Sequence, residues 1–165
     1  MERQYSENET RKMYEGITRT LIQKGLTITT MESCTAGQII SLITDTEGSS
    51  AITKGGFVTY SNEAKIMQGV PKEIIETYGV YSDETAKAMA ETCRAIYQAD
   101  IGIGVTGTFG NVDPNNKDSE IGCVYFAIDI RGTVKNYNIK INEKCSRYEY
   151  KLLVAEKIAD ELIFL

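Results

Sequence analysis

The chain has 165 residues, of which 42% are hydrophobic and 25% are charged, and its formal net charge is −5. This length suffices for one domain with a substantial core, and the composition is typical of a soluble globular protein. The acidic balance and the lack of a lysine or arginine cluster argue against nucleic acid as a partner. The first residues lack the apolar core of a secretion signal, and no segment approaches the roughly 18 uninterrupted apolar residues of a membrane span. We therefore expect a single cytoplasmic domain over residues 1–165, with no membrane segment.

The histidine and cysteine content narrows the possible chemistry. The chain contains no histidine, which excludes Ser-His-Asp and Cys-His catalysis and any histidine-ligated metal site. The four cysteines are scattered without a Cys-x-x-Cys pair, so the sequence predicts neither a zinc site nor a disulfide framework. They are Cys34, Cys93, Cys123 and Cys145.

The first predicted element is an amphipathic helix over Glu7–Lys24, whose apolar residues recur at helical spacing and which Gly25 ends. A strand over Leu26–Met31 follows. Apolar residues at helical spacing then predict a second helix over Gly37–Thr44. A small hydroxyl residue, Ser33, therefore lies where a strand turns into a helix, a position that can present a nucleophile at the edge of a sheet.

The turn around Ser33 has more than one interpretation. Unpaired N–H groups at a helix N-terminus can hold an anion, and those of Thr35, Ala36 and Gly37 are candidates for binding a substrate phosphate or the oxyanion of an acyl-transfer intermediate. Alternatively, Ser33 or Thr35 serves only as the N-cap of the helix. Cys34 is a rival nucleophile, since a thiol at a helix N-terminus can have a lowered pKa.

The next segment offers a base for Ser33. A strand is predicted over Gly56–Tyr60 and a helix over Asn62–Met67, which places Lys65 in the first turn of that helix. Without histidine, the usual base for a serine is a lysine whose pKa is lowered from about 10.4 to roughly 7 to 8 by burial or by neighbouring charge. Tyr60 and Lys65 would then share the mouth of one site. The alternative is that Lys65 is an ordinary solvated lysine.

The rest of the chain continues the alternation of helices and strands. It predicts, in order, helices over Lys72–Tyr78 and Ser82–Tyr97, a strand over Ile101–Val105, a long polar loop over Thr106–Glu120, strands over Gly122–Ile130 and Val134–Ile141, and a final helix over Ser146–Leu162.

The segment from Gly102 to Gly107 matches the pattern G-x-G-x-x-G, but its first glycines lie inside the predicted strand and no helix follows. A dinucleotide-binding loop is therefore not favoured. Glycines in a strand are better explained by close packing or by the close approach of a ligand.

This order of elements predicts a three-layer α/β/α domain with a mixed, largely parallel sheet covered on both faces. Ligands of such open sheets bind beyond the carboxyl ends of the strands. We therefore expect Ser33, Lys65 and Thr106 to converge in one crevice.

Three separated motifs, Glu32–Gly37, Tyr60–Lys65 and Val105–Gly107, closely resemble in order and spacing those of the CinA C-terminal domain family, the nicotinamide mononucleotide deamidases. The similarity extends from about Glu7 to Leu162. Many members of that family also carry an N-terminal domain resembling molybdopterin-binding proteins, so we expect the stand-alone form here.

The resemblance implies an amidohydrolase that converts nicotinamide mononucleotide and water to nicotinic acid mononucleotide and ammonia. The resemblance also implies that Ser33 is the nucleophile, that Lys65 is its base, and that Tyr60 assists proton transfer. It implies no cofactor and no metal, and its partner is a small-molecule mononucleotide. A homo-oligomer is the common expectation for a compact enzyme of this size. The positions that match the substrate-binding part of the family are Thr106, Gly107 and Arg147.

The sequence departs from the family pattern at two places. Ala36 stands where the family often has a glycine, and Thr108–Ser119 replaces an Ile-Ala-Gly-Pro segment and its glycine-rich continuation. Because this loop is expected to border the substrate, two other functions stay open: a nucleotide-binding or regulatory protein without turnover, and an amidase for another small amide.

Overall fold

A five-stranded sheet runs through the middle of the computed structural model, which describes residues 7–165. The first six residues of the predicted domain lie outside the described part. The strands lie in the order β2 (Phe57–Val58), β1 (Ile28–Glu32), β3 (Ile101–Gly107), β4 (Cys123–Ile130) and β5 (Thr133–Lys140).

The sheet is mixed, as predicted. The strands β2, β1 and β3 are parallel, whereas β4 and β5 are antiparallel to their neighbours. Half of the neighbouring pairs are therefore parallel, which is a smaller share than the sequence suggests. The difference arises because the chain between β3 and β4 forms no crossover helix and returns at the same edge, with Gly107 opposite Val124, so that β4 runs antiparallel to β3. The tight turn after β4 then makes β5 antiparallel as well.

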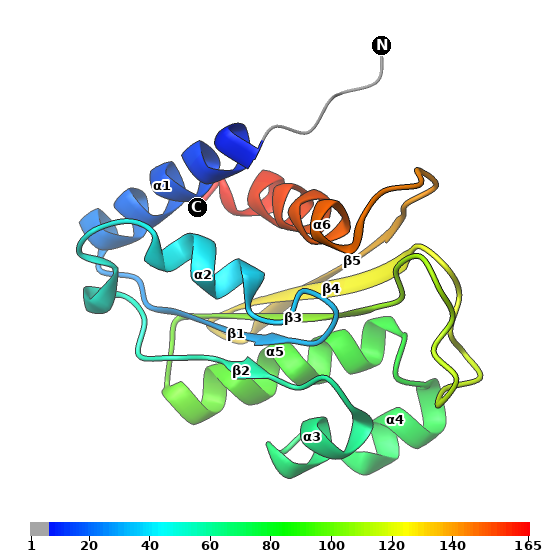
Figure 1. Ribbon diagram of the computed structural model, residues 1–165. Helices are drawn as coiled ribbons and strands as arrows, with labels where there is room; N and C mark the ends of the chain where they lie inside the picture. Colours follow the sequence, from blue (N-terminus) through cyan, green and yellow to red (C-terminus); the bar gives the residue numbers. More distant parts are fainter. Residues whose placement is uncertain (1–6) are drawn as a thin grey trace.

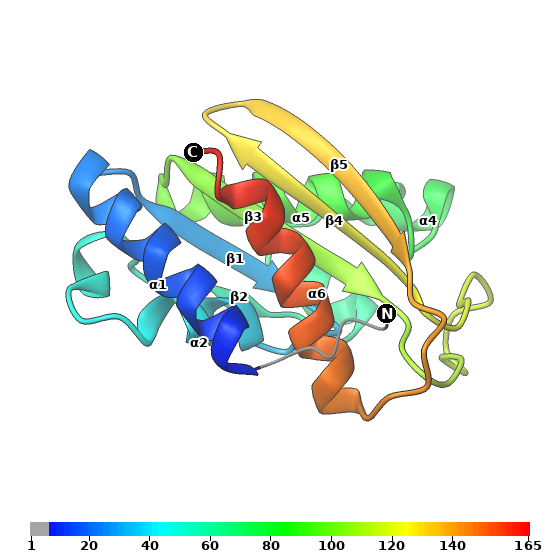
Figure 2. The same cartoon turned by 90° about the horizontal axis from the view of Figure 1, so that it is seen from above.

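Helices cover both faces of the sheet, which confirms the three-layer architecture (Figures 1 and 2). One layer holds α1 (Glu7–Lys24), α2 (Gln38–Thr44) and α6 (Arg147–Leu162), and the other holds α3 (Asn62–Met67), α4 (Lys72–Tyr78) and α5 (Asp83–Tyr97). A short 3-10 helix, η1 (Ser49–Ala51), precedes β2. No helix within residues 7–165 is long and apolar enough to cross a membrane.

Two glycines of the G-x-G-x-x-G pattern allow α5 to pack closely on β3. A Cβ atom on Gly102 would lie 2.3 Å from the carbonyl oxygen of Ala90, and one on Gly104 would lie 2.2 Å from that of Ala86. Both distances are far below van der Waals contact. The packing interpretation of these glycines is therefore confirmed.

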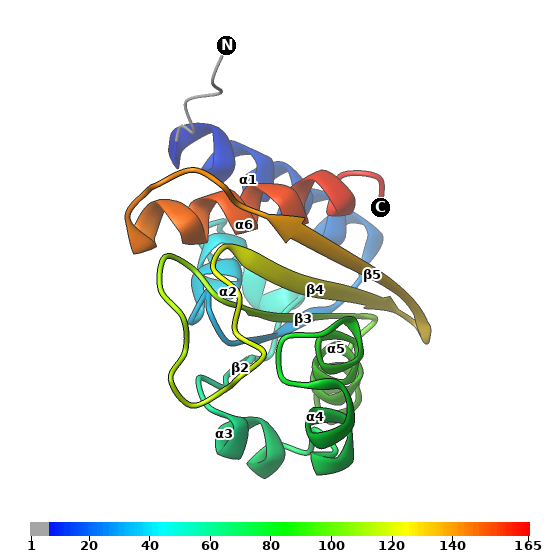
Figure 3. The ribbon, with the colours of Figure 1, turned by 90° about the vertical axis from the view of Figure 1, so that its right-hand side faces the viewer.

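The carboxyl ends of the three parallel strands meet at one edge of the sheet, which faces the viewer in Figure 3. In the register, Glu32 at the end of β1 lies opposite Val105 of β3 and Val58 of β2. The pairing continues beyond β1, because the Ser33 N–H donates a 2.9 Å hydrogen bond to the Val105 carbonyl and the Thr59 N–H donates one of 2.9 Å to the Glu32 carbonyl. This edge therefore gathers the segments that were expected to form the site.

Candidate active site

Ser33 lines a cavity of about 730 Å³ at this edge. The cavity walls come from the turn after β1, the start of α3 and the residues just before it, the segment between α4 and α5, the end of β3 with the loop that follows it, and the first residue of α6. The Nζ atom of Lys65 lies 3.1 Å from the Oγ atom of Ser33. Two residues that were expected to act together are therefore in direct contact.

Lys65 is buried, with 1% of its surface exposed, in the short helix α3 that the Ser61 side chain caps. Burial lowers the pKa of Lys65 from 10.5 to about 8. Its Nζ atom lies 2.9 Å from the Thr59 carbonyl oxygen and 3.5 Å from that of Ser61. A neutral amine has two N–H donors and one lone pair, so with its hydrogens on these two carbonyls its lone pair faces the Ser33 hydroxyl. Lys65 can then accept the proton of Ser33.

Cys34, the rival nucleophile, is buried beside Ser33 with 4% of its surface exposed. Burial raises the pKa of the Cys34 thiol to about 12, and the negative charge of Glu32 contributes in the same direction. Because a thiol reacts as its thiolate, Cys34 is chemically inert near neutral pH. The geometry and the pKa values both favour Ser33.

The carboxylate of Glu32 occupies the N-terminus of α2. Its side chain is completely buried, and its two oxygens accept hydrogen bonds from the backbone N–H groups of Ile39 (2.9 Å) and Ile40 (3.1 Å). They also accept hydrogen bonds from the hydroxyls of Thr35 (2.6 Å) and Thr30 (2.9 Å). The sequence indicated an anion at this helix terminus, and the structure corrects its identity: the anion is a side chain of the protein itself.

Replacing Glu32 by alanine is expected to destabilise the protein by roughly 2 to 4 kcal/mol, because two buried backbone donors and two hydroxyls lose their acceptor. Urea unfolding followed by circular dichroism measures the effect. Glu63→Ala, at an exposed position of α3, is the matched control and should leave stability within about 0.5 kcal/mol. A Glu32→Ala protein as stable as the control would show that these hydrogen bonds contribute nothing.

The sequence predicted that three N–H groups bind the substrate, those of Thr35, Ala36 and Gly37. None of these residues lines the cavity. The Ala36 N–H donates to the Ser33 carbonyl at 3.0 Å and so closes the turn. Ala36 has a φ of 48° and Gly37 a φ of 94°. Ala36 therefore adopts the left-handed conformation that glycine adopts without strain.

Thr106 and Gly107 have different positions relative to the cavity. Thr106 is completely buried outside it, and its hydroxyl donates a 3.0 Å hydrogen bond to the Val80 carbonyl. Gly107 lines the cavity. Thr106 therefore supports the wall of the cavity from behind, and only Gly107 is placed to touch a ligand.

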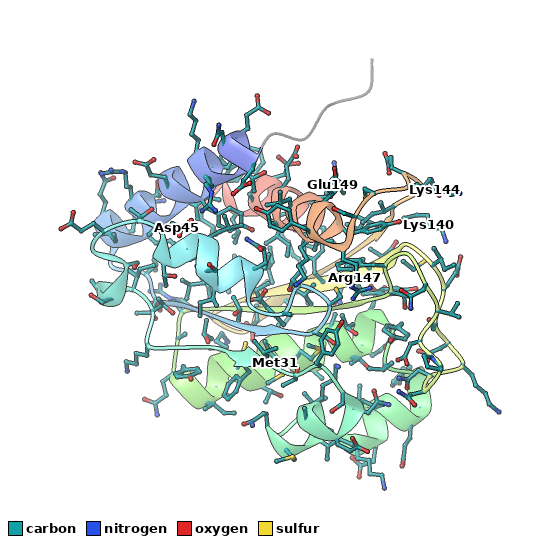
Figure 4. The ribbon with its side chains drawn as sticks, in the orientation of Figure 1. Met31, Asp45, Lys140, Lys144, Arg147 and Glu149 are labelled. Carbon is teal, nitrogen blue, oxygen red and sulfur yellow. The ribbon has the colours of Figure 1, made fainter. Side chains whose placement is uncertain are left out.

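Arg147 and Tyr60 also line the cavity and contact each other. The Nη2 atom of Arg147 donates a 2.8 Å hydrogen bond to the hydroxyl of Tyr60, and the guanidinium lies 5.4 Å from the centre of the Phe109 ring. Figure 4 shows Arg147 on the side of α6 that faces the sheet, whereas Glu149 lies on the upper side. Tyr60 is 61% exposed, and the hydrogen bond of its hydroxyl is with Arg147. Its help in proton transfer therefore stays a prediction.

The loop after β3 borders the cavity, as expected, and contributes a residue that the sequence did not single out. The Asp113 carboxylate lines the cavity and accepts 2.6 Å hydrogen bonds from the Tyr81 hydroxyl and from Asn116 Nδ2. Asn116 in turn accepts a 2.8 Å hydrogen bond from Asn62 of α3. An Asp-Pro-Asn-Asn segment is a turn signal, and nothing in its local pattern shows which cavity its carboxylate will reach.

The described part of the chain has no cluster of three or more histidine, cysteine, aspartate or glutamate side chains that could hold a metal ion.

A model of the CinA C-terminal domain matches residues 10–157 of the chain. A protein of Halothermothrix orenii, provisionally named competence-damage inducible, is 42% identical over 154 residues, which cover 92% of this chain and 36% of the relative. A protein of Clostridium kluyveri with the same provisional name is 42% identical over 132 residues, which cover 79% of this chain and 32% of the relative. The chain thus spans about a third of the length of these curated relatives.

Solved structures share the whole fold. The competence/damage inducible protein CihA from Agrobacterium tumefaciens is 31% identical and has a TM-score of 0.84, with 94% of both chains covered. A CinA superfamily protein from Enterobacter cloacae is 25% identical and has a TM-score of 0.85, with 99% of this chain and 97% of that chain covered. Together with the match over residues 10–157, these likenesses show that the chain belongs to the CinA C-terminal domain family.

Proposed function

We propose that the protein is an amidohydrolase in which Ser33 is the nucleophile and Lys65 its general base. The observation that carries the proposal is the 3.1 Å contact between Lys65 Nζ and Ser33 Oγ in a buried setting. A lysine with a pKa of about 8 has a usable fraction of neutral amine near neutral pH. The chain has no histidine that could take this role.

The proposed reaction has two half-reactions, and Lys65 transfers the proton in both. Ser33 Oγ attacks the carboxamide carbon while its proton passes to Lys65 Nζ. The C–N bond of the tetrahedral intermediate then breaks, and ammonia leaves with the proton that Lys65 returns. Water attacks the resulting Ser33 ester, and Lys65 accepts a proton from that water and returns it to Ser33 Oγ. The product leaves as the carboxylic acid, which releases its proton to solvent and becomes the carboxylate.

We propose nicotinamide mononucleotide as the substrate, on the resemblance of the Glu32–Gly37 and Tyr60–Lys65 motifs to those of nicotinamide mononucleotide deamidases. A cavity of about 730 Å³ falls in the usual range for small-molecule sites. The guanidinium of Arg147, held on the cavity wall, is a suitable donor to a phosphate. A cytoplasmic location and a homo-oligomeric state stay predictions.

One observation favours a second candidate, an amidase for another small amide. Much of the cavity wall, from Thr108 to Asn116, belongs to the loop that departs from the family pattern. A change in this wall alters the shape offered to the substrate without touching the pair of Ser33 and Lys65. The chemistry would then be retained and the substrate changed.

Incubation of the purified protein with nicotinamide mononucleotide tests the proposal. We expect ammonia and nicotinic acid mononucleotide in equal amounts, measured by a coupled ammonia assay and by chromatography. Thermal stabilisation by the nucleotide without any product would instead indicate a binding protein without turnover. Ammonia released from other small amides, with none from the nucleotide, would favour the second candidate.

A further inference from the structure

The cavity contains a carboxylate to which the proposed reaction gives no role. Asp113 lines the same cavity as Ser33 and Lys65. Its side chain accepts hydrogen bonds from the Tyr81 hydroxyl, from Asn116 Nδ2 and, at 2.9 Å, from the Asn115 backbone N–H. All of these donors are uncharged, so they orient the carboxylate without cancelling its charge. Within residues 7–165, Asp113 is not a member of any ion pair.

The position of Asp113 is held from several directions. Its backbone N–H donates a 2.7 Å hydrogen bond to Ser119 Oγ, which lies 3.2 Å from the hydroxyl of Thr108 at the start of the loop. Asn116 connects the carboxylate to Asn62 at the beginning of α3, the helix that also carries Lys65. The carboxylate is therefore preorganised relative to the reaction centre.

Asp113 is ionised at neutral pH and its charge reaches the reaction centre. Partial burial raises the pKa of Asp113, but the hydrogen bonds from Tyr81, Asn116 and Asn115, together with the charge of Lys65, outweigh this and lower its pKa overall. In turn, the negative charge of Asp113 partly offsets the lowering of the Lys65 pKa by burial.

When Lys65 acts as a base it is neutral, so the positive charge of Lys65 that acts on Asp113 is then absent. A substrate that carries a positive charge close to its carboxamide would replace it. In nicotinamide mononucleotide the carboxamide is attached to a pyridinium ring. When the carboxamide carbon lies next to Ser33 Oγ for attack, the positively charged ring therefore lies within the electric field of Asp113. We propose that Asp113 is a specificity-determining residue that selects carboxamides attached to a cationic ring over those attached to an uncharged ring. The inference rests on the proposed function for the identity of the reacting group.

A matched pair of ligands isolates the ring charge. Nicotinamide mononucleotide and its reduced form share the carboxamide, the ribose and the phosphate, but the dihydropyridine ring of the reduced form is neutral. Binding is measured by isothermal titration calorimetry on Ser33→Ala protein, so that neither ligand is consumed, and at about pH 9, where most of Lys65 is neutral. We expect the Ser33→Ala protein to bind the cationic form at least about fivefold more tightly than the neutral form.

Adding Asp113→Asn should bring the ratio of the two affinities to within about twofold, mainly by weakening the binding of the cationic form. Asp118→Asn is the matched control in the same loop, since Asp118 accepts a hydrogen bond from the Tyr81 N–H and does not line the cavity. It should leave the ratio unchanged.

Equal affinity for the two forms in the Ser33→Ala protein overturns the proposal even if the Asp113→Asn protein does not fold. A ratio that persists in a folded Asp113→Asn protein overturns it as well.

Turnover, measured separately on the unsubstituted protein, distinguishes the two proposals. If nicotinamide mononucleotide is hydrolysed but the two ring forms bind equally, the selection by Asp113 is wrong and the amidohydrolase proposal stands. If the nucleotide is not hydrolysed but the preference exists and is lost with Asp113, nicotinamide mononucleotide is not the substrate and the selection by Asp113 stands. If neither form binds, both the assignment of this substrate and the selection by Asp113 are overturned.

Discussion

Ser33→Ala protein is expected to release ammonia from nicotinamide mononucleotide at least about 1,000-fold more slowly than the unsubstituted protein, because the attacking oxygen is absent. The substitution removes only one oxygen from a side chain whose backbone N–H holds the pairing with Val105. The fold should therefore be unaffected, and a thermal melt verifies this. The measurement is the initial rate of ammonia release at saturating substrate.

Cys34→Ala is the matched control for this result, since it removes a nucleophilic atom from the next residue on the same cavity wall. With its thiol pKa raised to about 12 by burial, Cys34 is protonated in the working range. We expect most of the activity to remain, with a modest loss of stability from the small cavity. The opposite pattern, an active Ser33→Ala protein and an inactive Cys34→Ala protein, would assign the nucleophile to the thiol.

Lys65→Met protein is expected to lose activity by roughly 100-fold to 10,000-fold, the usual contribution of a positioned general base. In the unsubstituted protein, kcat/KM should rise with pH and level off above about pH 8, as Lys65 loses its proton. Lys72→Met, at an exposed position of α4, is the control and should keep both the rate and the pH profile. If kcat/KM of the unsubstituted protein did not change with pH around pH 8, the role of Lys65 as general base would be contradicted.

The substitution Lys65→Met is also expected to stabilise the fold below about pH 8. The unfolded chain keeps the Lys65 proton up to its ordinary pKa of 10.5, whereas the folded protein releases it above about 8. The unsubstituted protein therefore gains stability as the pH rises through this window, by up to about 3 kcal/mol. Lys65→Met protein avoids the cost of burying the charge, so its advantage should be largest below pH 8 and vanish above about pH 10.5. Urea unfolding of both proteins at pH 7 and pH 10.5 measures the difference.

The bounds of several helices could be predicted from local sequence. The predicted bounds of α3 and α4 and the predicted end of α1 at Lys24 agree with the structure, because apolar spacing and capping residues act within the helix itself. The strand β2 covers only Phe57–Val58 and is shorter than the predicted Gly56–Tyr60. An edge strand has one neighbour, so its length depends on how far β1 runs beside it and not on its own residues.

The candidate site was predictable in part. The absence of histidine and the motifs around Ser33 and Lys65 predicted a serine paired with a lysine, and the structure places these side chains in contact. The residue that occupies the N-terminus of α2 was not predictable. Glu32 lies in the first motif, but whether its carboxylate turns toward α2 or toward the cavity depends on the path of the chain after β1.

The sequence by itself determined the alternation of helices and strands, the family resemblance and the exclusion of histidine chemistry, since these depend on residue types and on their spacing along the chain. Only the tertiary structure decided the environment of each group: that Lys65 is buried against Ser33, that Glu32 occupies the N-terminus of α2, and that Asp113 reaches the cavity. Ser33 and Lys65 are 32 residues apart, and Asp113 lies a further 48 residues along the chain. The physical reason is that burial and electrostatic fields depend on distance in space, which the packing of the sheet and its helices sets.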